Sequence, residues 1–486
     1  MPMIHSQENT PLYDALLSHM NKKSISCHVP GHKNSAVFHL KGKEIFEELL
    51  KIDMTELDGL DDLHAPEGPI LEAQLLLSQL YNTERSYFLI NGSTCGNLAV
   101  IMGVCNEGDV VFVQRNCHKS ILHGLMLAKV KPIFLQTNYN EDWGTAEGVL
   151  PQTLEKALVK YPNAKAIILT YPSYYGIGGH IQDLVCKARQ SGLCVIVDEA
   201  HGAHFIAGEP FMKSSLAYGA DYVVQSAHKT LPAMTMGSYL HRNHGAPHSE
   251  KVELYLQMLQ SSSPSYPIMA SLDLARSYIG TLSKEDLQYT KDQIVRFKSQ
   301  LRKVSGIKVL EKLEEDYDIL KLTIQAQGPF SGYDLQSKLN QAGVYVELAD
   351  PYNILFVLPI LKQGQYYPYE EIIRAIEKVV FQLNQQTGAR ETLSITKVDN
   401  DKELTELALS FDEMKNKKTC FISIEDAENK IAAETITPYP PGIPCILNGE
   451  RLNKKKILYI QDLVKLGTKF HGGVNLTSNN QIRIYI

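Results

Sequence analysis

The chain has 486 residues, enough for two or three domains with a large core, and its hydrophobic fraction of 44% is ordinary for a globular protein. Its net charge of −6 gives no electrostatic footprint for nucleic acid binding. The sequence has no apolar run of about 18 residues, no signal peptide at its polar N-terminus and no Cys-x-x-Cys pair among its eight cysteines. These features predict a cytoplasmic protein that binds neither nucleic acid nor membrane.

The first 81 residues are expected to form helices joined by two polar loops. Helical spacing marks residues 11–17 and 70–81. Between them lie a Pro-Gly loop that carries His28 and His32, and an acidic loop over residues 55–68. The first loop is typical of a turn with exposed polar residues. The second would be a solvated surface or, beside a crevice, would attract a cationic substrate.

From Ser86 onward, apolar runs of strand length alternate with segments of helical spacing. The expected strands are residues 86–91, 110–113, 133–135, 166–170, 195–197 and 222–224, and the expected helices are residues 120–128, 151–159 and 181–190. This alternation predicts the α/β fold class, with a mostly parallel sheet covered by helices on both faces.

The rest of the chain predicts smaller α+β domains. Helices are expected at residues 252–260, 293–304, 333–341, 369–385 and 456–464, and strands at residues 319–324, 345–346 and 355–357. Residues 393–417 are expected to form a linker with a surface helix, and residues 436–444 a polyproline-like segment. The predicted domains are an N-terminal segment with active-site loops (1–65), a large domain (66–280), a small domain (281–390) and a C-terminal domain (391–486).

Lys229 follows a buried strand, at a place where a charged amine is costly unless it is solvated, paired or bonded. One interpretation is a lysine that snorkels to the rim of the sheet. The other is a lysine that forms an imine with an aldehyde cofactor, in which the ammonium is replaced.

Two further motifs favour the cofactor. Asp198 ends another apolar strand, and strand ends of an open α/β sheet converge on one crevice. Ser93 and Thr94 lie in a Gly/Ser/Thr turn between a strand and a helix, where the helix N-terminus offers an anion site. A lysine, a carboxylate and a phosphate site are the groups that bind pyridoxal 5′-phosphate (PLP), so the three motifs together predict this cofactor.

Other polar residues also follow strands. His118 would stack on a flat cofactor ring or cap the next helix, and Ser173 would reach the phenolic oxygen of the cofactor. The turn at residues 261–263 would be a flexible loop or a second phosphate contact. His201 and His204 are three residues apart, but no third ligand with suitable spacing accompanies them, so no metal site is predicted.

Seven motifs resemble those of the fold-type-I (aspartate aminotransferase-like) PLP decarboxylases of the ornithine/lysine/arginine group, over nearly the whole chain. They are Val29–Lys33 (VPGHK), Leu60–His64 (LDDLH), Asn91–Thr94 (NGST), Arg115–Ser120 (RNCHKS), Asp198–His201 (DEAH), Ser226–Lys229 (SAHK) and Pro438–Pro444 (PYPPGIP).

The resemblance implies roles for particular residues. Lys229 would form the Schiff base, Asp198 would pair with the pyridinium nitrogen and His118 would stack on the ring. The remaining implied cofactor contacts are Ser93, Thr94, Ser173, Ala200, His201, Ser226 and His228, with Ser261 or Ser262 reaching the phosphate of the neighbouring subunit. Glu347 and Asp350 would contact the substrate, and Lys229 or His228 would return the proton to Cα.

The implied function is decarboxylation of a basic L-amino acid, arginine or lysine ahead of ornithine, in polyamine metabolism, by a homodimer with shared active sites. Large members of this group carry an N-terminal wing domain that mediates decamer formation, whereas the fold here is expected to begin near Pro11. Those members also have Trp at the position of His201, so substrate choice does not carry over from them.

Two alternatives stay open at this point. An aminotransferase on the same fold would hold the substrate α-carboxylate with a cation, whereas a decarboxylase benefits from leaving it loosely held and desolvated. Release of CO₂ rather than formation of a keto acid would separate the two. The second alternative is a PLP-binding protein without catalysis, which would show cofactor absorbance without turnover of any basic amino acid.

Overall fold

The computed structural model describes residues 6–22, 24–312, 316–328, 330–386, 403–439 and 442–486. These residues divide into two units. Unit 1 comprises the chain up to Val104 together with Cys194–Gly208 and Lys213–Ser283, and unit 2 comprises Cys105–Leu193, Glu209–Met212 and the chain from Lys284 onward. Among the described residues, no helix is both long and apolar enough to cross a membrane.

The strands described in unit 1 lie in the order β1 (Arg85–Leu89), β9 (Ser238–Arg242), β8 (Tyr222–Gln225) and β7 (Cys194–Asp198). Strands β7 and β8 are parallel, and Asp198 pairs with Val224. The β1–β9 and β9–β8 pairs are antiparallel. The carboxyl ends of β7 and β8 therefore lie side by side, as the sequence predicted for Asp198 and the segment that leads to Lys229.

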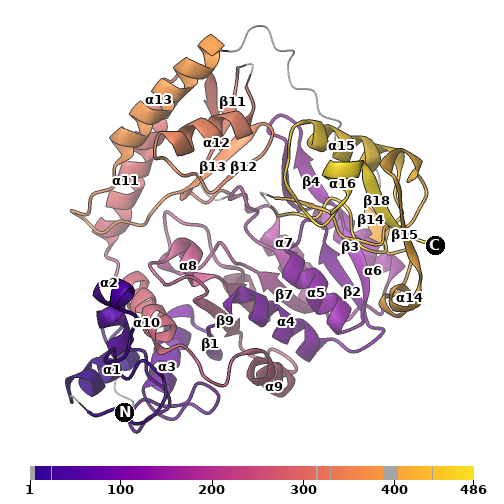
Figure 1. Ribbon diagram of the computed structural model, residues 1–486. Helices are drawn as coiled ribbons and strands as arrows, with labels where there is room; N and C mark the ends of the chain where they lie inside the picture. Colours follow the sequence, from indigo (N-terminus) through magenta and orange to yellow (C-terminus); the bar gives the residue numbers. More distant parts are fainter. Residues whose placement is uncertain (1–5, 23, 313–315, 329, 387–402, 440–441) are drawn as a thin grey trace. The chain divides into compact units, whose positions relative to one another are not determined.

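The helices of unit 1 are α1 (Pro11–Asn21), α2 (Leu40–Lys51), α3 (Pro69–Tyr81), α4 (Gly92–Val104), α8 (Ala227–Thr230), α9 (Ser249–Leu259) and α10 (Tyr266–Gly280). Helices α1, α3 and α10 pack together (Figure 1). The buried Arg276–Asp273 ion pair of α10, with N–O distance 2.6 Å, ties this group to the N-terminal segment, because Asp273 also accepts a hydrogen bond from Leu12 N at 3.1 Å.

Helix α4 packs closely against β1, β8 and α9 because two of its contact positions are glycines. A Cβ atom on Gly96 would lie 2.7 Å from Leu89 Cδ1 and 3.0 Å from Val224 Cγ1. A Cβ atom on Gly103 would lie 2.7 Å from Val252 Cγ2 of α9. The start of α4 is thereby held against the ends of β1 and β8.

Unit 2 contains β6 (Ala166–Thr170), β2 (Val110–Gln114), β3 (Lys131–Leu135) and β14 (Leu404–Glu406) in this order. The first three strands are parallel and β14 is antiparallel to β3. Helices α5 (Lys119–Leu127), α6 (Pro151–Lys160) and α7 (Ile181–Gln190) alternate with these strands, and β4 (Thr137–Asn140) and β5 (Thr145–Val149) form a hairpin. The predicted α/β alternation is thus confirmed.

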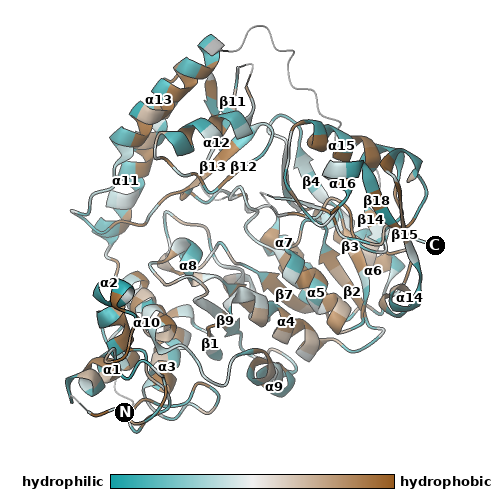
Figure 2. Ribbon diagram, in the orientation of Figure 1, coloured by the Kyte–Doolittle hydropathy of each residue, from teal (hydrophilic) through white to brown (hydrophobic). Residues whose placement is uncertain are grey.

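A second, antiparallel sheet of unit 2 has the order β10 (Ile307–Val309), β11 (Lys321–Ala326), β13 (Asn353–Val357) and β12 (Leu348–Ala349). Helix α12 (Gly332–Gln341) packs on this sheet, and α13 (Tyr369–Gln386) packs on α12 and on α11 (Lys284–Leu301). Along α13, hydrophobic and hydrophilic residues mark different faces (Figure 2). Its buried residues Ile372, Ile376, Val379 and Leu383 have helical spacing, which explains why the sequence predicted it.

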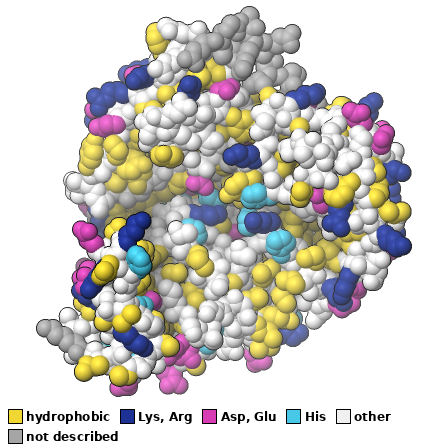
Figure 3. Space-filling model, viewed as in Figure 1, with side chains coloured by type: hydrophobic (Ala, Val, Ile, Leu, Met, Phe, Trp, Pro, Cys, Tyr) yellow, Lys and Arg dark blue, Asp and Glu magenta, His cyan; other side chains and the backbone are white. Residues whose placement is uncertain are grey.

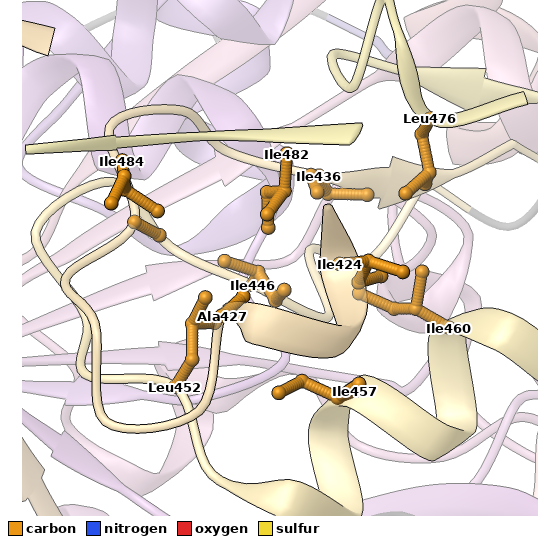
Figure 4. Packing of buried hydrophobic residues seen from close by; sticks show 11 residues of the cluster. Ile424, Ala427, Ile436, Ile446, Leu452, Ile457, Ile460, Leu476, Ile482 and Ile484 are labelled. Carbon is orange, nitrogen blue, oxygen red and sulfur yellow. The ribbon is translucent and has the colours of Figure 1, made fainter. Parts of the chain in front are cut away.

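The C-terminal part of unit 2 has its own core (Figure 4). Its elements are α14 (Phe411–Asn416), β15 (Thr419–Ser423), β16 (Thr437–Pro438), α15 (Lys454–Lys465), β17 (Phe470–His471), α16 (Leu476–Asn479) and β18 (Gln481–Tyr485). Ile436, Ile446, Ile460 and Ile482 meet in the core and are fully buried. Strand β15 pairs with β18, and β16 with β17.

Some expected elements differ from the structure. The strand predicted at residues 345–346 is wrong, because Tyr345 is 79% exposed and pairing starts at Leu348, where the side chains become buried. Helix α2 was not predicted, and neither was the short helix α8 that carries Lys229. Part of the predicted linker and of the polyproline-like segment, residues 393–402 and 440–441, lies outside the described residues.

His241 on β9 is a buried histidine whose two ring nitrogens are both used. Its Nδ1 lies 2.8 Å from Ser86 Oγ, and its Nε2 lies 3.1 Å from Gln225 Oε1. Tyr81 of α3 stacks on the ring with centroids 4.1 Å apart. Burial lowers the pKa of His241 to about 3, so the folded protein keeps this ring neutral.

We expect His241 to make the folded state less stable in acid. Below an ordinary pKa of about 6.5 the unfolded chain binds a proton here, whereas the folded protein does not bind one until about pH 3. Between pH 7 and pH 5 the free energy of unfolding of the wild type should therefore fall by about 2 kcal/mol relative to His241→Gln, which retains one donor and one acceptor. Urea unfolding of both proteins at the two pH values checks this, and parallel pH dependences would contradict it.

Candidate active site

The turn between β1 and α4 brings hydroxyl groups to a helix N-terminus. Gly92 has a φ of +78°, which favours glycine and allows the chain to turn into the helix. Ser226, at the end of β8, donates a hydrogen bond through Oγ to Ser93 Oγ at 2.8 Å. Thr94 lies next to Ser93 and is exposed. Because the first turn of a helix has backbone N–H groups without intrahelical partners, this arrangement can bind an anion such as a phosphate.

Asp198 is buried at the end of β7 and is held by two neutral donors. Its Oδ2 accepts a hydrogen bond from Asn97 Nδ2 of α4 at 3.1 Å, and its Oδ1 accepts one from Ala200 N at 3.3 Å. The side chain is nearly inaccessible, with the residue 3% exposed. Since neither donor carries a charge, the carboxylate can stabilise a cation such as a protonated ring nitrogen.

Lys229 and its neighbour His228 occupy the short helix α8. The Nζ atom of Lys229 lies 3.2 Å from Nε2 of the buried His201. His228 Nδ1 lies 3.0 Å from the carbonyl oxygen of Gly237, so Nδ1 carries the proton and donates. Unit 1 therefore combines an amine, a carboxylate and an anion site, which fit the aldehyde, the ring nitrogen and the phosphate of PLP.

His118 and Ser173 lie in unit 2, and each side chain accepts a hydrogen bond from a nearby backbone N–H group. His118 caps α5, because its Nδ1 accepts hydrogen bonds from Ser120 N at 3.3 Å and Ser120 Oγ at 2.9 Å. The capping that the sequence allowed is therefore present, and the stacking of His118 on a cofactor ring stays a prediction. Ser173 is buried in the loop after β6, and its Oγ accepts a hydrogen bond from Ile177 N at 3.1 Å.

Two family descriptions match the chain. Residues 10–323 match "Orn/Lys/Arg decarboxylase, major domain" and residues 397–475 match "Orn/Lys/Arg decarboxylase, C-terminal domain". The chain belongs to the Orn/Lys/Arg decarboxylase family. It is therefore an amino-acid decarboxylase.

The relatives of this decarboxylase agree with the family. It is 44% identical to the uncharacterized protein YaaO of Bacillus subtilis, over 98% of this chain and 99% of the relative. It is 29% identical to an arginine decarboxylase of the same organism, over 96% of each chain. The solved constitutive lysine decarboxylase of E. coli shares the fold, with a TM-score of 0.79 at 19% identity, over 99% of this chain and 82% of that chain. A solved structure of SPT with PLP also shares the fold, with a TM-score of 0.53 at 18% identity, over 70% of this chain and 83% of that chain.

The turn that contains Ser261 and Ser262 is exposed in unit 1 of the decarboxylase. Ser261 Oγ donates to the carbonyl oxygen of Ser263 at 3.3 Å, and Ser261 N donates to Asn91 Oδ1 at 3.4 Å. Asn91 directly precedes the turn into α4, so this segment is anchored to the same loop as the anion site.

The two predicted substrate contacts, both in unit 2, differ in environment. Glu347 is exposed just before β12. Asp350 is buried and accepts hydrogen bonds from the Tyr175 hydroxyl group, from Tyr352 N and Asn353 N at 2.7 Å each, and from Asn353 Nδ2. Burial raises the pKa of Asp350, while these donors act in the opposite direction. The contacts give Asp350 a structural role in this turn, whereas the Glu347 carboxylate is accessible.

A cavity of about 980 Å³ lies within unit 2. Arg115 and Asn116 line it at the carboxyl end of β2, and Gln136 and Thr137 line it after β3. Ligands of open α/β sheets bind outside the carboxyl ends of the strands, so the position suits small molecules. Arg115 also joins the C-terminal part of the decarboxylase, because it donates to the carbonyl oxygen of Pro444 at 2.7 Å.

Several contacts of the site were not predicted. Asn97 donates a hydrogen bond to Asp198 and belongs to the predicted turn and helix. Its contact with a carboxylate could not be predicted from the sequence pattern. Glu199 was noted only as part of a motif, although it is fully buried. Among the described residues, no three potential metal ligands lie together, and the His204 ring lies tilted against Phe205 at 59°, with ring centroids 4.6 Å apart.

On the face shown in Figure 3, Lys and Arg side chains are scattered among Asp and Glu side chains rather than gathered in a single basic patch. This distribution agrees with the net charge of −6. Neither feature favours a polyanionic partner on that face.

Proposed function

We propose that this protein uses PLP to decarboxylate a basic L-amino acid, arginine or lysine ahead of ornithine, and thereby supplies an amine for polyamine metabolism. The observation that carries the proposal is the set of groups in unit 1, where Lys229, Asp198 and the Ser93–Ser226 anion site lie at the ends of two parallel strands and at the start of α4. Bound PLP supplies an electron sink for the charge that remains on Cα when CO₂ leaves.

Different residues of this chain would bind the cofactor and transfer the proton. Lys229 would hold the cofactor covalently, and Asp198 would keep its ring nitrogen protonated. Further contacts to the cofactor would come from Ser93, Thr94, His118, Ser173, Ala200, His201, Ser226 and His228. Lys229 or His228 would deliver the proton to Cα, since both side chains carry a nitrogen at the site.

One assay tests the function. The purified protein, loaded with PLP, is incubated separately with carboxyl-labelled arginine, lysine and ornithine, and both CO₂ and keto acids are measured. We expect CO₂ release, highest with arginine or lysine. Keto-acid formation would instead identify an aminotransferase. Cofactor absorbance without either product would identify a PLP-binding protein without catalysis.

Glu347→Gln should weaken substrate binding more than cofactor binding. The exposed carboxylate would pair with the distal guanidinium or ammonium group of the substrate, and such charge-assisted pairs are stronger than neutral ones. We expect KM to rise by about 10-fold or more, with the cofactor absorbance unchanged. Glu425→Gln, at an exposed position in the C-terminal part, serves as the control. An unchanged KM for the best substrate would remove Glu347 from this role.

We also propose that the active unit is a homodimer in which Ser261 or Ser262 reaches the phosphate of the partner. Ser261→Asp would repel that phosphate, and Lys229→Ala would remove the attachment point, so each variant alone should be nearly inactive. In a mixed dimer one site carries both changes and the other carries neither, because two-fold symmetry makes the sites composite. Reassembly of an equal mixture should restore about a quarter of the wild-type sites. Mixed dimers, proven by mass spectrometry, that show no recovery would contradict the shared site.

A further inference from the structure

Glu199 follows Asp198 directly, yet the two carboxylates have different surroundings. Asp198 accepts a hydrogen bond from Asn97 on α4. Glu199 instead contacts Gln225 at the end of β8 and the short helix η2 (Ser215–Tyr218). Successive side chains at a strand end point to opposite faces of a sheet, which separates the two environments. Glu199 is fully buried, and the role derived for PLP binding leaves it unused.

The Glu199 carboxylate accepts four hydrogen bonds. Its Oε1 accepts from Gln225 Nε2 at 2.7 Å and from Ser214 Oγ at 2.8 Å. Its Oε2 accepts from Ser215 N at 2.8 Å and from Ser215 Oγ at 2.5 Å. Burial raises the pKa of Glu199 and the four donors lower it, and the balance of the two leaves the pKa at about 7. The ionised carboxylate therefore depends on its donors, since a buried charge without them is costly.

These contacts continue as a chain of hydrogen bonds across three strands. Gln225 donates to Glu199, so its Oε1 is the atom that accepts from His241 Nε2. His241 is neutral, so its Nδ1 accepts from Ser86 Oγ, and Ser86 Oγ in turn accepts from Thr83 Oγ1 at 2.8 Å. When the Glu199 carboxylate is ionised it only accepts, and this fixes the direction of every donor along the chain.

Backbone contacts join the same two strand ends. Glu199 N donates to the carbonyl oxygen of Val224 at 2.8 Å, and Ser226 N donates to that of Ala200 at 3.3 Å. A Cβ atom on Gly202 would lie 2.6 Å from Glu199 Cγ, so the turn after β7 folds back over this side chain. The segment that carries Asp198 and His201 is therefore tied through Glu199 to the segment that leads into Lys229.

We propose that Glu199 is a positioning residue that fixes the Asp198 carboxylate and the His201–Lys229 contact by anchoring the end of β7 to the end of β8. This role rests on the proposed PLP function. Glu199→Gln would place a donor where two donors already point, and the turn would shift to relieve the conflict.

The test uses the PLP-loaded protein and the visible absorbance of the cofactor bound to Lys229, titrated with pH. Glu199→Gln should still form the borohydride-trappable adduct. Because a moved Asp198 no longer stabilises the protonated ring nitrogen to the same extent, the pH midpoint of the absorbance change should shift by about one unit or more. The value of kcat should fall by about 10-fold or more, with KM nearly unchanged.

Two matched variants separate positioning from stability alone. Ser86→Ala removes the far end of the chain but leaves all four donors of Glu199, so it should lower the melting temperature without moving the pH midpoint. The exchange variant Glu199→Gln with Gln225→Glu keeps one carboxylate in the chain with reversed order. It should recover part of the midpoint shift and part of kcat.

Ser214→Ala provides a milder change, should Glu199→Gln fail to fold. It removes one donor to Glu199 and should move the midpoint in the same direction by a smaller amount. An unshifted midpoint with wild-type kcat in folded Glu199→Gln, or in Ser214→Ala if the first does not fold, would overturn this proposal while leaving the PLP function intact. A wild-type protein that forms no adduct with PLP would overturn both.

Discussion

Lys229→Ala is expected to abolish covalent attachment of PLP and to leave no measurable decarboxylation. The amine of Lys229 lies at the carboxyl end of β8, next to the buried His201 and close in sequence to Ser226 of the anion site. Alanine has no side-chain amine and cannot form the imine, so the cofactor would be held by non-covalent contacts alone. Treatment with borohydride, proteolysis and mass spectrometry should detect the adduct on Lys229 in the wild type and no adduct in the variant.

Two controls make this result specific. Lys251→Ala removes an exposed lysine from α9 of the same unit and should leave both the adduct and turnover unchanged. Lys229→Arg keeps a cation beside His201 but cannot form the imine at neutral pH, so it should behave like Lys229→Ala. An adduct on another lysine of the wild type would show that Lys229 was assigned wrongly.

Hydrophobic periodicity accounts for the part of the fold that the sequence predicted well. The bounds of β6 and α7 match the predicted residues 166–170 and 181–190, because an apolar run and a helical stripe each reflect burial in the finished fold. Helix α2 was not predicted because its hydrophobic residues do not form a buried face. Leu40 and Ile45, for example, are more than 80% exposed. The prediction of a strand at residues 345–346 was wrong for a related reason. These residues have high β propensity, but propensity without burial is not enough to form a strand.

In the candidate site, too, the sequence predicted some features and missed others. Lys229, Asp198 and Ser93 follow from their places at strand ends and at the start of a helix, which a sequence displays directly. The contacts of Asn97 with Asp198 and of His241 with Gln225 depend on which elements become neighbours, and they join residues 101 and 16 positions apart. A pattern in one sequence carries no record of such pairs, so the support around the site had to come from the structure.

The structure also connects the site to the stability of the protein. The polar chain from Ser86 to Glu199 is buried in unit 1, where a group left without its hydrogen bond is costly. Such a network is tolerable only when every member has its partner, and the described donors and acceptors meet this condition in one consistent direction. The hydrogen bonds that satisfy the buried groups of this network also fix the residues next to Lys229 and Asp198.

Asp198→Asn should retain PLP but lose most of the turnover. The substitution is nearly isosteric, and the new amide can be accommodated, since its oxygen can still accept from Ala200 N while the Asn97 amide reverses to accept from its nitrogen. What it removes is the negative charge that would keep the cofactor ring nitrogen protonated. Because a charge in a dry site acts strongly on a nearby cation, we expect kcat to fall by on the order of 10²-fold or more.

The measurement compares kcat, KM and cofactor content of Asp198→Asn with those of Asp221→Asn. Asp221 is a buried aspartate in the same unit, and its Oδ2 accepts a hydrogen bond from Val195 N at 2.7 Å. Loss of that carboxylate should lower the stability of the sheet while leaving kcat near the wild-type value, because its contact lies at the opposite ends of β7 and β8 from Asp198. Near-wild-type turnover in Asp198→Asn with full cofactor content would show that another group keeps the ring nitrogen protonated. A large loss of cofactor from Asp198→Asn would show instead that this carboxylate serves binding more than chemistry.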